Sequence, residues 1–100
     1  MDKVVFRKEN DGSIYAIFPY MLADRHNITV WDHVSGHGAC SFSYAIMHSK
    51  PASPDEYAKS KRILENTYGY KLEILKRMPS YKSFLRYAKT ACGIFLKDLV

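Results

Sequence analysis

The feature that most constrains the fold is a hairpin pattern at the start of the chain. Two β-prone runs, Lys3–Lys8 (KVVFRK) and Ser13–Phe18 (SIYAIF), are separated by the turn-forming residues ENDG. Aspartate followed by glycine favours a tight turn, because both residues tolerate backbone angles that other residues avoid. The pattern therefore predicts an antiparallel hairpin at the start of a sheet, with Pro19 ending the second strand.

A third strand and a histidine-rich turn are expected to follow the hairpin. Asn27–His33 (NITVWDH) is rich in β-branched and aromatic residues, which favour strands. Ser35–Gly38 (SGHG) should form a turn, because glycine on both sides of a histidine suits irregular backbone. The pattern of Cys40–Met47 is less regular, and this segment is a candidate for one more strand.

The second half opens with the pattern of a capped helix. Ser53 is a good N-cap, a proline occupies the next position, and Glu56 completes a capping box. The helix should cover Pro54–Tyr68 and stop at Gly69. Tyr70–Arg77 then alternates apolar and polar residues, which predicts a half-buried strand.

Ser80–Leu99 has the most regular helical pattern in the chain, with an apolar stripe opposite a basic one. The expected order of elements is therefore β-β-β-(β)-α-β-α. We predict one α+β domain over residues 1–100, in which a mainly antiparallel sheet of about four strands packs with two helices.

Alternation along the strands predicts what each face of the sheet carries. The inward face should hold apolar side chains, namely Val4, Phe6, Ile14, Ala16, Ile28, Val30, Leu72 and Ile74. The opposite face would then present an aromatic and basic surface made of Arg7, Tyr15, Ile17, Trp31, His33, Lys71, Leu75 and Arg77. Either the last helix covers this surface or both helices lie on the inward face, and the pattern leaves both arrangements open.

The net charge of +5 comes from the C-terminal half of the chain. Residues 1–53 carry five basic and five acidic side chains, whereas residues 54–100 carry ten basic and five acidic ones. A basic stripe runs from Lys71 to Lys89 and includes Arg77 and Arg86. Such a stripe attracts a polyanion or an acidic protein, although a solvated helix face has the same composition.

The segment WDHVSGHGAC gathers side chains with several kinds of chemistry. His33, His37 and Cys40 have the spacing of three metal ligands on one loop. No Cys-x2-Cys pair accompanies them, so we expect neither a metal nor another cofactor. The two histidines would suit a phosphodiesterase or nuclease if both faced one phosphate. That enzyme and a zinc-binding regulatory module are the alternatives to a binding protein.

The same segment is also suited to holding an anion without chemistry. Gly36 and Gly38 leave backbone N–H groups uncovered, and the neighbouring histidines donate hydrogen bonds to phosphate oxygens. Trp31 and Tyr15 would stack on a base. The plain alternative is a glycine turn whose histidines cap backbone groups or lie in a partner interface.

Several short motifs recur in an order typical of one protein family. They are Val5-Phe6-Arg7-Lys8, Ile14 to Pro19 (IYAIFP), His33-x-x-Gly36-His37-Gly38, Pro51-Ala52 with Glu56-Tyr57, and Gly69-Tyr70-Lys71-Leu72. In this order they resemble a family of small uncharacterised proteins of phages and bacterial mobile elements. The resemblance covers residues 3–78, so residues 79–100 would be an additional C-terminal helix. It implies a setting inside a bacterial host and no particular activity.

These observations favour a binding protein over an enzyme. A small phage-type protein without a recognisable catalytic constellation is expected to act by stoichiometric binding and to blunt a host defence. Its partner would be a host effector protein, as for anti-CRISPR proteins, or an anionic nucleotide or nucleic acid that it sequesters. A homo-oligomer is compatible with the pattern.

We expect the protein to lie in the cytoplasm of the host and to have no membrane partner. The start of the chain lacks an apolar run of signal-peptide length. No segment reaches the roughly 18 consecutive apolar residues of a membrane span. In this compartment the thiols of Cys40 and Cys92 should be reduced.

Overall fold

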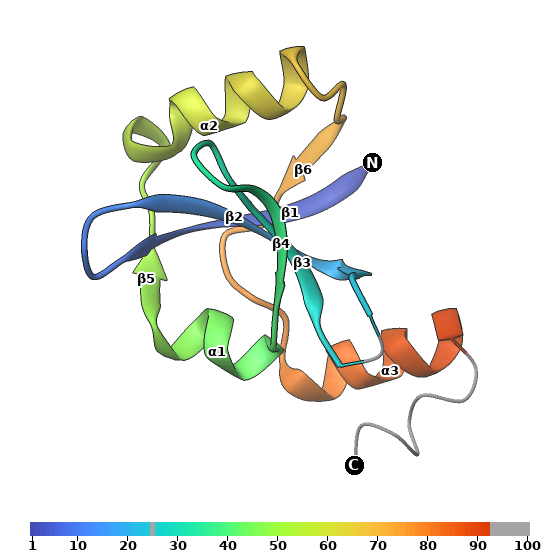
Figure 1. The fold of residues 1–100 in the computed structure, drawn as a ribbon. Helices are drawn as coiled ribbons and strands as arrows, with labels where there is room; N and C mark the ends of the chain where they lie inside the picture. Colours follow the sequence, from blue (N-terminus) through green and yellow to red (C-terminus); the bar gives the residue numbers. More distant parts are fainter. Residues whose placement is uncertain (25, 93–100) are drawn as a thin grey trace.

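In the part of the chain that the structure describes, a six-stranded sheet carries one helix on one face and two helices on the other (Figure 1). The computed structural model describes residues 1–24 and 26–92, and side chains as far as residue 87. The α+β class is confirmed, and within these ranges every strand pair is antiparallel except that of β1 (Asp2–Glu9) with β6 (Leu72–Ile74). The expected count of about four strands is too low, because β4 (Gly36–Cys40) and β5 (Ser49–Pro51) contain few β-prone residues.

The predicted hairpin is confirmed. β1 pairs antiparallel with β2 (Ile14–Leu22), and Gly12 in the turn has a φ of 91°, a conformation that favours glycine. The prediction that Pro19 ends the second strand is wrong, because β2 continues through it. A register shift between Phe18 and Leu22 accommodates the proline, since an irregular ladder does not require its missing N–H.

The turn predicted at SGHG lies closer to the N-terminus than expected. β3 (Ile28–Asp32) pairs with β4, and only residues 33–35 form the turn. The Asp32 carboxylate accepts hydrogen bonds from the backbone N–H groups of Val34 at 2.9 Å and Ser35 at 2.6 Å. Gly36 has a φ of 76° and begins β4. The aspartate and this glycine complete the turn early, so the remaining residues of SGHG lie in a strand.

A short helix replaces the further strand considered for Cys40–Met47. The Ser41 side chain accepts a hydrogen bond from the backbone N–H of Tyr44 at 3.1 Å and caps α1 (Phe42–Met47). This local hydrogen bond favours a helix where the apolar pattern is ambiguous.

The later elements agree with the prediction in kind and differ in length. The capped helix is α2 (Pro54–Asn66), with both hydrogen bonds of the predicted capping box present. The strand predicted at Tyr70–Arg77 is shorter and covers β6 alone. The last helix, α3, covers Tyr81–Cys92, and the rest of the predicted Ser80–Leu99 helix lies outside the described residues.

Both faces of the sheet are covered, so of the two arrangements that the pattern leaves open, the one in which the last helix covers the second face is present. α2 packs on one face, and α1 and α3 pack on the other. Within β3 the predicted faces are exchanged, because Trp31 packs beneath α2 whereas Ile28 and Val30 face α1 and α3. The register pairs Trp31 with Ala16, and residues directly opposite each other share a face. Alternation within one strand does not specify this register.

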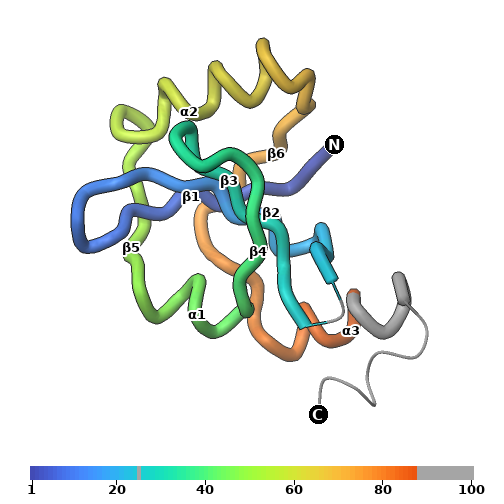
Figure 2. Tube along the Cα trace, in the orientation of Figure 1, coloured from blue at the N-terminus to red at the C-terminus, as the bar shows by residue number. Residues whose placement is uncertain are grey.

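The strand order leaves the two edges of the sheet in different states. The order is β4-β3-β2-β1-β5, and β6 lies beside the first half of β1. β4 is therefore one edge, while β5 and β6 share the far side of β1. Figure 2 shows the β3–β4 hairpin with its turn directed toward α2. No helix in the described ranges combines the length and the hydrophobicity of a membrane-crossing segment.

Candidate functional site

The strand β4 is an open edge of the sheet. It pairs with β3 on one side, and none of the described residues forms a strand on its other side. His37, Gly38 and Ala39 are exposed, so the middle of the strand is accessible. The strand contains no charged residue and no proline, which are usual means of protecting an edge. An accessible, neutral edge of this kind is able to pair with another chain.

The backbone groups of β4 point alternately toward β3 and toward solvent. In the first hairpin the Glu9 N–H donates to the Ser13 carbonyl at 2.9 Å, which makes these two residues a hydrogen-bonded pair. Alternation across the sheet then makes Val30 and Gly38 a hydrogen-bonded pair as well. The N–H and C=O of Gly38 therefore point toward β3.

The same alternation directs the N–H and C=O groups of His37 and Ala39 away from the sheet. A contact on β1 supports this assignment. The Phe6 carbonyl, which the alternation points away from β2, accepts a hydrogen bond from the Ala52 N–H at 3.2 Å. β4 thus offers two donors and two acceptors to a further strand.

His37 lies against two tyrosines that follow α2. Its Nε2 is 2.8 Å from the hydroxyl of Tyr70, and its ring meets that of Tyr68 edge-on with centroids 5.2 Å apart. A phenol hydroxyl both donates and accepts, so the contact with Tyr70 holds in either neutral tautomer of the histidine. Burial raises the pKa of Tyr70, with further contributions from Asp2 and Tyr68, so its hydroxyl stays protonated at neutral pH.

Trp31 lies beneath this contact. It is 1% exposed, and its ring meets that of Tyr68 edge-on at 5.8 Å. Its Nε1 is buried without a hydrogen-bond partner among the described residues. A buried donor left unpaired costs about 1–3 kcal/mol, which packing has to offset. Contrary to the prediction, the ring has no exposed face on which a base can stack.

Two other predicted ligand-binding residues are part of the interior. The Tyr15 hydroxyl is buried and donates to the Ala45 carbonyl at 2.7 Å. The Arg7 guanidinium donates to the Ser49 hydroxyl at 2.9 Å, the Ser49 carbonyl at 2.8 Å and the Ile46 carbonyl at 3.2 Å. These contacts join α1 and β5 to β1. Tyr15 and Arg7 therefore lie on the covered face of the sheet and do not form an exposed surface for a ligand.

The two histidines of the predicted site have different surroundings. His33 lines a hollow of about 410 Å³ together with Glu9, Tyr15 and Asp32, between the turns of the two hairpins. His37 instead contacts the tyrosines that follow α2. These contacts do not place both histidines at one phosphate, as the expected phosphodiesterase would require.

Cys40 does not complete a metal site with either histidine. Among the described residues, no group of three or more His, Cys, Asp or Glu side chains is arranged to hold a metal ion. Burial raises the pKa of the Cys40 thiol, and Glu9 adds to the effect. A protonated thiol is a poor nucleophile, so these surroundings do not activate Cys40.

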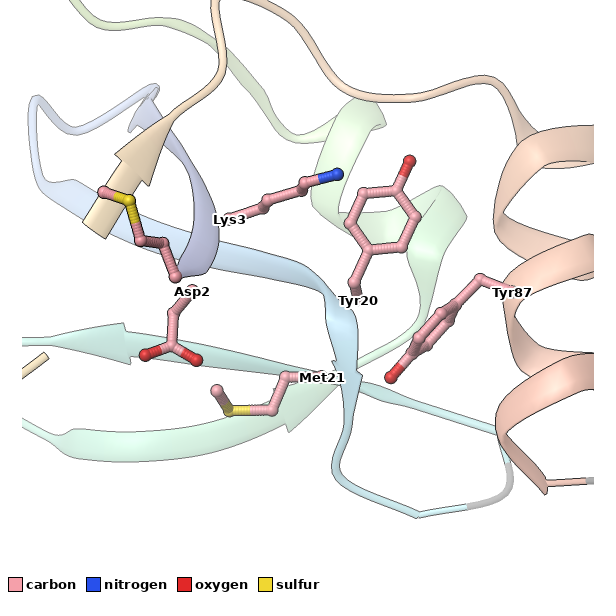
Figure 3. Close-up of a pocket in the computed structure, with 6 residues that line it drawn as sticks. Asp2, Lys3, Tyr20, Met21 and Tyr87 are labelled. Atoms are coloured by element: carbon pink, nitrogen blue, oxygen red, sulfur yellow. The ribbon is translucent and has the colours of Figure 1, made fainter. Parts of the chain in front are cut away.

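The three predicted basic ligands, Lys71, Arg77 and Arg86, are exposed. They come from the segment before β6, the segment after it and α3, respectively. They line neither the hollow at His33 nor the hollow beside Lys3 that is shown in Figure 3. Their contribution is to the positive field around the molecule, which acts over a longer range than contact.

The hollow beside Lys3 has a volume of about 390 Å³ and lies between β1, β2 and α3 (Figure 3). The Lys3 ammonium is 5.3 Å from the centre of the Tyr20 ring, and the Tyr20 and Tyr87 rings meet edge-on at 5.2 Å. Asp2 also lines this hollow and carries the opposite charge to Lys3. The hollow therefore has no marked preference for an anion.

Sequence reasoning misses three residues of the open edge and its surroundings. The sequence pattern places Tyr68 at the end of a helix and Tyr70 at the start of a strand, and it assigns no role to Ala39. The one available signal is the small, neutral composition of GHGA, which is typical of an edge or of a close approach by another backbone. No family model, curated protein or solved structure matches the chain.

Proposed function

We propose that the protein binds a partner protein without catalytic turnover, and that β4 receives a strand of this partner. The observation that carries the proposal is the exposed, neutral edge at which His37 and Ala39 direct their N–H and C=O groups outward. A strand added to such an edge gains main-chain hydrogen bonds, while neighbouring side chains select its sequence. His37 and Tyr68 lie beside the edge and would make that selection.

The alternative functions have less support. The expected phosphodiesterase or nuclease needs both histidines at one phosphate, and their surroundings differ. Sequestration of a nucleotide would require Trp31 and Tyr15 to stack on its base, and both side chains are buried. A zinc-binding regulatory module needs a ligand set that the described residues do not assemble. Strand addition at β4 depends on none of these features.

The partner class that we propose is an effector protein of a bacterial host. The order of the sequence motifs predicts a relationship to proteins of phages and mobile elements, and a small protein of this kind would blunt a host defence most simply by occupying a surface of an effector. The net charge of +5 favours an acidic partner surface and accelerates encounter with it.

Ala39→Pro tests the proposal, because it removes an outward N–H and leaves the pairing with β3 in place. Immobilised wild-type protein should retain a specific protein from a bacterial lysate, and the variant should retain about tenfold less, the equivalent of one lost hydrogen bond. Ala39→Ser keeps the N–H and is the matched control. In the purified complex, amide hydrogen exchange at His37 and Ala39 should slow.

Equal retention by Ala39→Pro and Ala39→Ser would refute strand addition, since such a partner does not use the outward N–H. The small molecules released on denaturing the purified protein test the other functions. An intact nucleotide would favour sequestration, and a chemically altered one would favour an enzyme.

A further inference from the structure

An apolar groove lies directly beyond the end of β4. It has a volume of about 310 Å³ and is lined by Phe42, Ile46 and Met47 of α1, by Pro79 just before α3 and by Tyr81 at its start, together with Ser43 and Ser80. Met47 is 77% exposed, Tyr81 47% and Ile46 36%. Single exposed apolar side chains, scattered over the surface, are common in proteins. Several of them gathered around one groove are instead typical of an interaction site.

The groove is continuous with the open edge. Phe42 lines the groove and lies two residues after Cys40, the last residue of β4, so the end of β4 is within about 7 Å of a residue that lines the groove. β4 runs toward α1 (Figure 1). A partner strand antiparallel to β4 runs away from α1, so the residues that reach the groove are those that precede its paired segment.

The face of β4 on the groove side lacks large side chains. Gly36, Gly38 and Cys40 share this face, because Gly38 lies opposite Val30 and Cys40 opposite Ile28 in the core beneath α1 and α3. A Cβ added at Gly38 would meet only Val30 Cγ2, at an ordinary 3.8 Å, and one at Gly36 would meet nothing within 4 Å. Apolar side chains of a partner strand therefore have room on this face, next to Val30.

We infer that β4 and the groove form one binding surface for an extended peptide of the partner protein. A bulky apolar residue of the peptide fills the groove, and the residues after it pair with β4 as an antiparallel strand with its apolar side toward α1 and α3. The remaining positions favour acidic residues, because the chain has a net charge of +5. This inference rests on the proposed function, since it names the partner of the same edge.

A displayed library of random 12-residue peptides, selected on the wild-type full chain, is the probe. Selected peptides should share a bulky apolar residue ahead of an alternating segment. Met47→Lys should weaken their binding about tenfold, the cost of one apolar side chain that is no longer buried. Tyr44→Lys is the matched control, because Tyr44 is exposed on α1 but does not line the groove. Ala39→Pro should weaken binding as well, and circular dichroism should show all three variants folded.

The outcomes separate the inference from the proposed function. Peptides that lose affinity for Ala39→Pro but bind Met47→Lys as well as wild type would refute the role of the groove and leave strand addition at β4 unaffected. Peptides that ignore Ala39→Pro would overturn both, and so would a library that yields no binder. Self-association of the wild type that Met47→Lys abolishes would assign the groove to a second copy of the chain and overturn the inference.

Discussion

The two edges of the sheet are built differently. At one edge β1 is covered by β5 and β6, which are three residues long each, and β5 contains Lys50 and Pro51. At the other edge β4 is exposed over its three central residues and carries no charge. Short strands, lysine and proline all discourage pairing with another chain. The chain thus protects one edge and leaves the other accessible, which is the arrangement expected of a sheet that binds at a single edge.

The largest effect that we expect comes from loosening the protected edge at Arg7. Its guanidinium donates three hydrogen bonds to Ser49 and Ile46, and alanine would remove all of them. The acceptors lie in a part-buried region, so Arg7→Ala should lower the free energy of unfolding by about 3 kcal/mol. Urea unfolding followed by circular dichroism measures this loss.

Lys8→Ala is the control for Arg7→Ala, because Lys8 is the next residue of β1 and makes only an exposed ion pair with Glu56. Exposed ion pairs contribute little, so this control should stay close to wild type. A loss below about 1 kcal/mol for Arg7→Ala would mean that strand pairing alone holds β5. The difference between the edges would then lie in strand length and composition only.

Proline substitutions at two adjacent positions of β4 compare a backbone N–H that points toward β3 with one that points to solvent. Gly38→Pro removes an N–H that points toward β3, and it should cost about 2 kcal/mol of unfolding free energy. Ala39→Pro removes an N–H that points to solvent, and it should cost less than about 1 kcal/mol. Thermal and urea unfolding of the two variants give the comparison. Equal losses would contradict the assignment of outward groups, and with it the account of β4 as an edge ready to pair.

Local signals predict those parts of the fold that local hydrogen bonds determine. The Asp-Gly turn and the Ser53–Glu56 capping box each specify one arrangement, and both are present as expected. Hydrogen bonds also decide the end of β3 and the start of α1, through the side chains of Asp32 and Ser41. The apolar pattern takes no account of these two polar residues, so a prediction from that pattern alone misplaces the turn and the helix.

The candidate site depends on register and strand order, which the sequence pattern does not specify. Moving β3 by one residue would carry Trp31 to the other face of the sheet. The contact between His37 and Tyr70 joins residues 33 positions apart, and no local pattern reveals it. The glycines and histidine of GHGAC predict a turn, and only the strand order shows that this segment is an edge strand of the sheet.

A further difference between the edges is an ion pair that ties the protected one to α2. Lys8 Nζ lies 2.6 Å from Glu56 Oε2, and Glu56 Oε1 accepts a hydrogen bond from the Ser53 N–H at 2.9 Å. Lys8 and then the capping hydrogen bond lower the pKa of Glu56 from 4.5 to about 2. The unfolded chain therefore binds this proton more tightly than the folded one. The stability that Glu56 contributes is present above pH 4.5 and is lost as the pH falls toward 2.

Glu56→Gln gives the smallest effect that we expect, a flatter response of stability to acid. Glutamine keeps an acceptor for the Ser53 N–H but carries no charge for Lys8 and does not titrate. The urea midpoint of the wild type should fall more steeply than that of the variant between pH 4.5 and about 2. Hydrogen bonds also lower the pKa values of Asp11 and Asp24, but these contributions are common to both proteins and cancel.

Because the Lys8–Glu56 pair is exposed, the difference between the two pH profiles should shrink in about 1 M salt. Parallel pH profiles at low salt would mean that Lys8 and Glu56 add nothing to the protected edge, and that Arg7 and the strand pairing hold it alone.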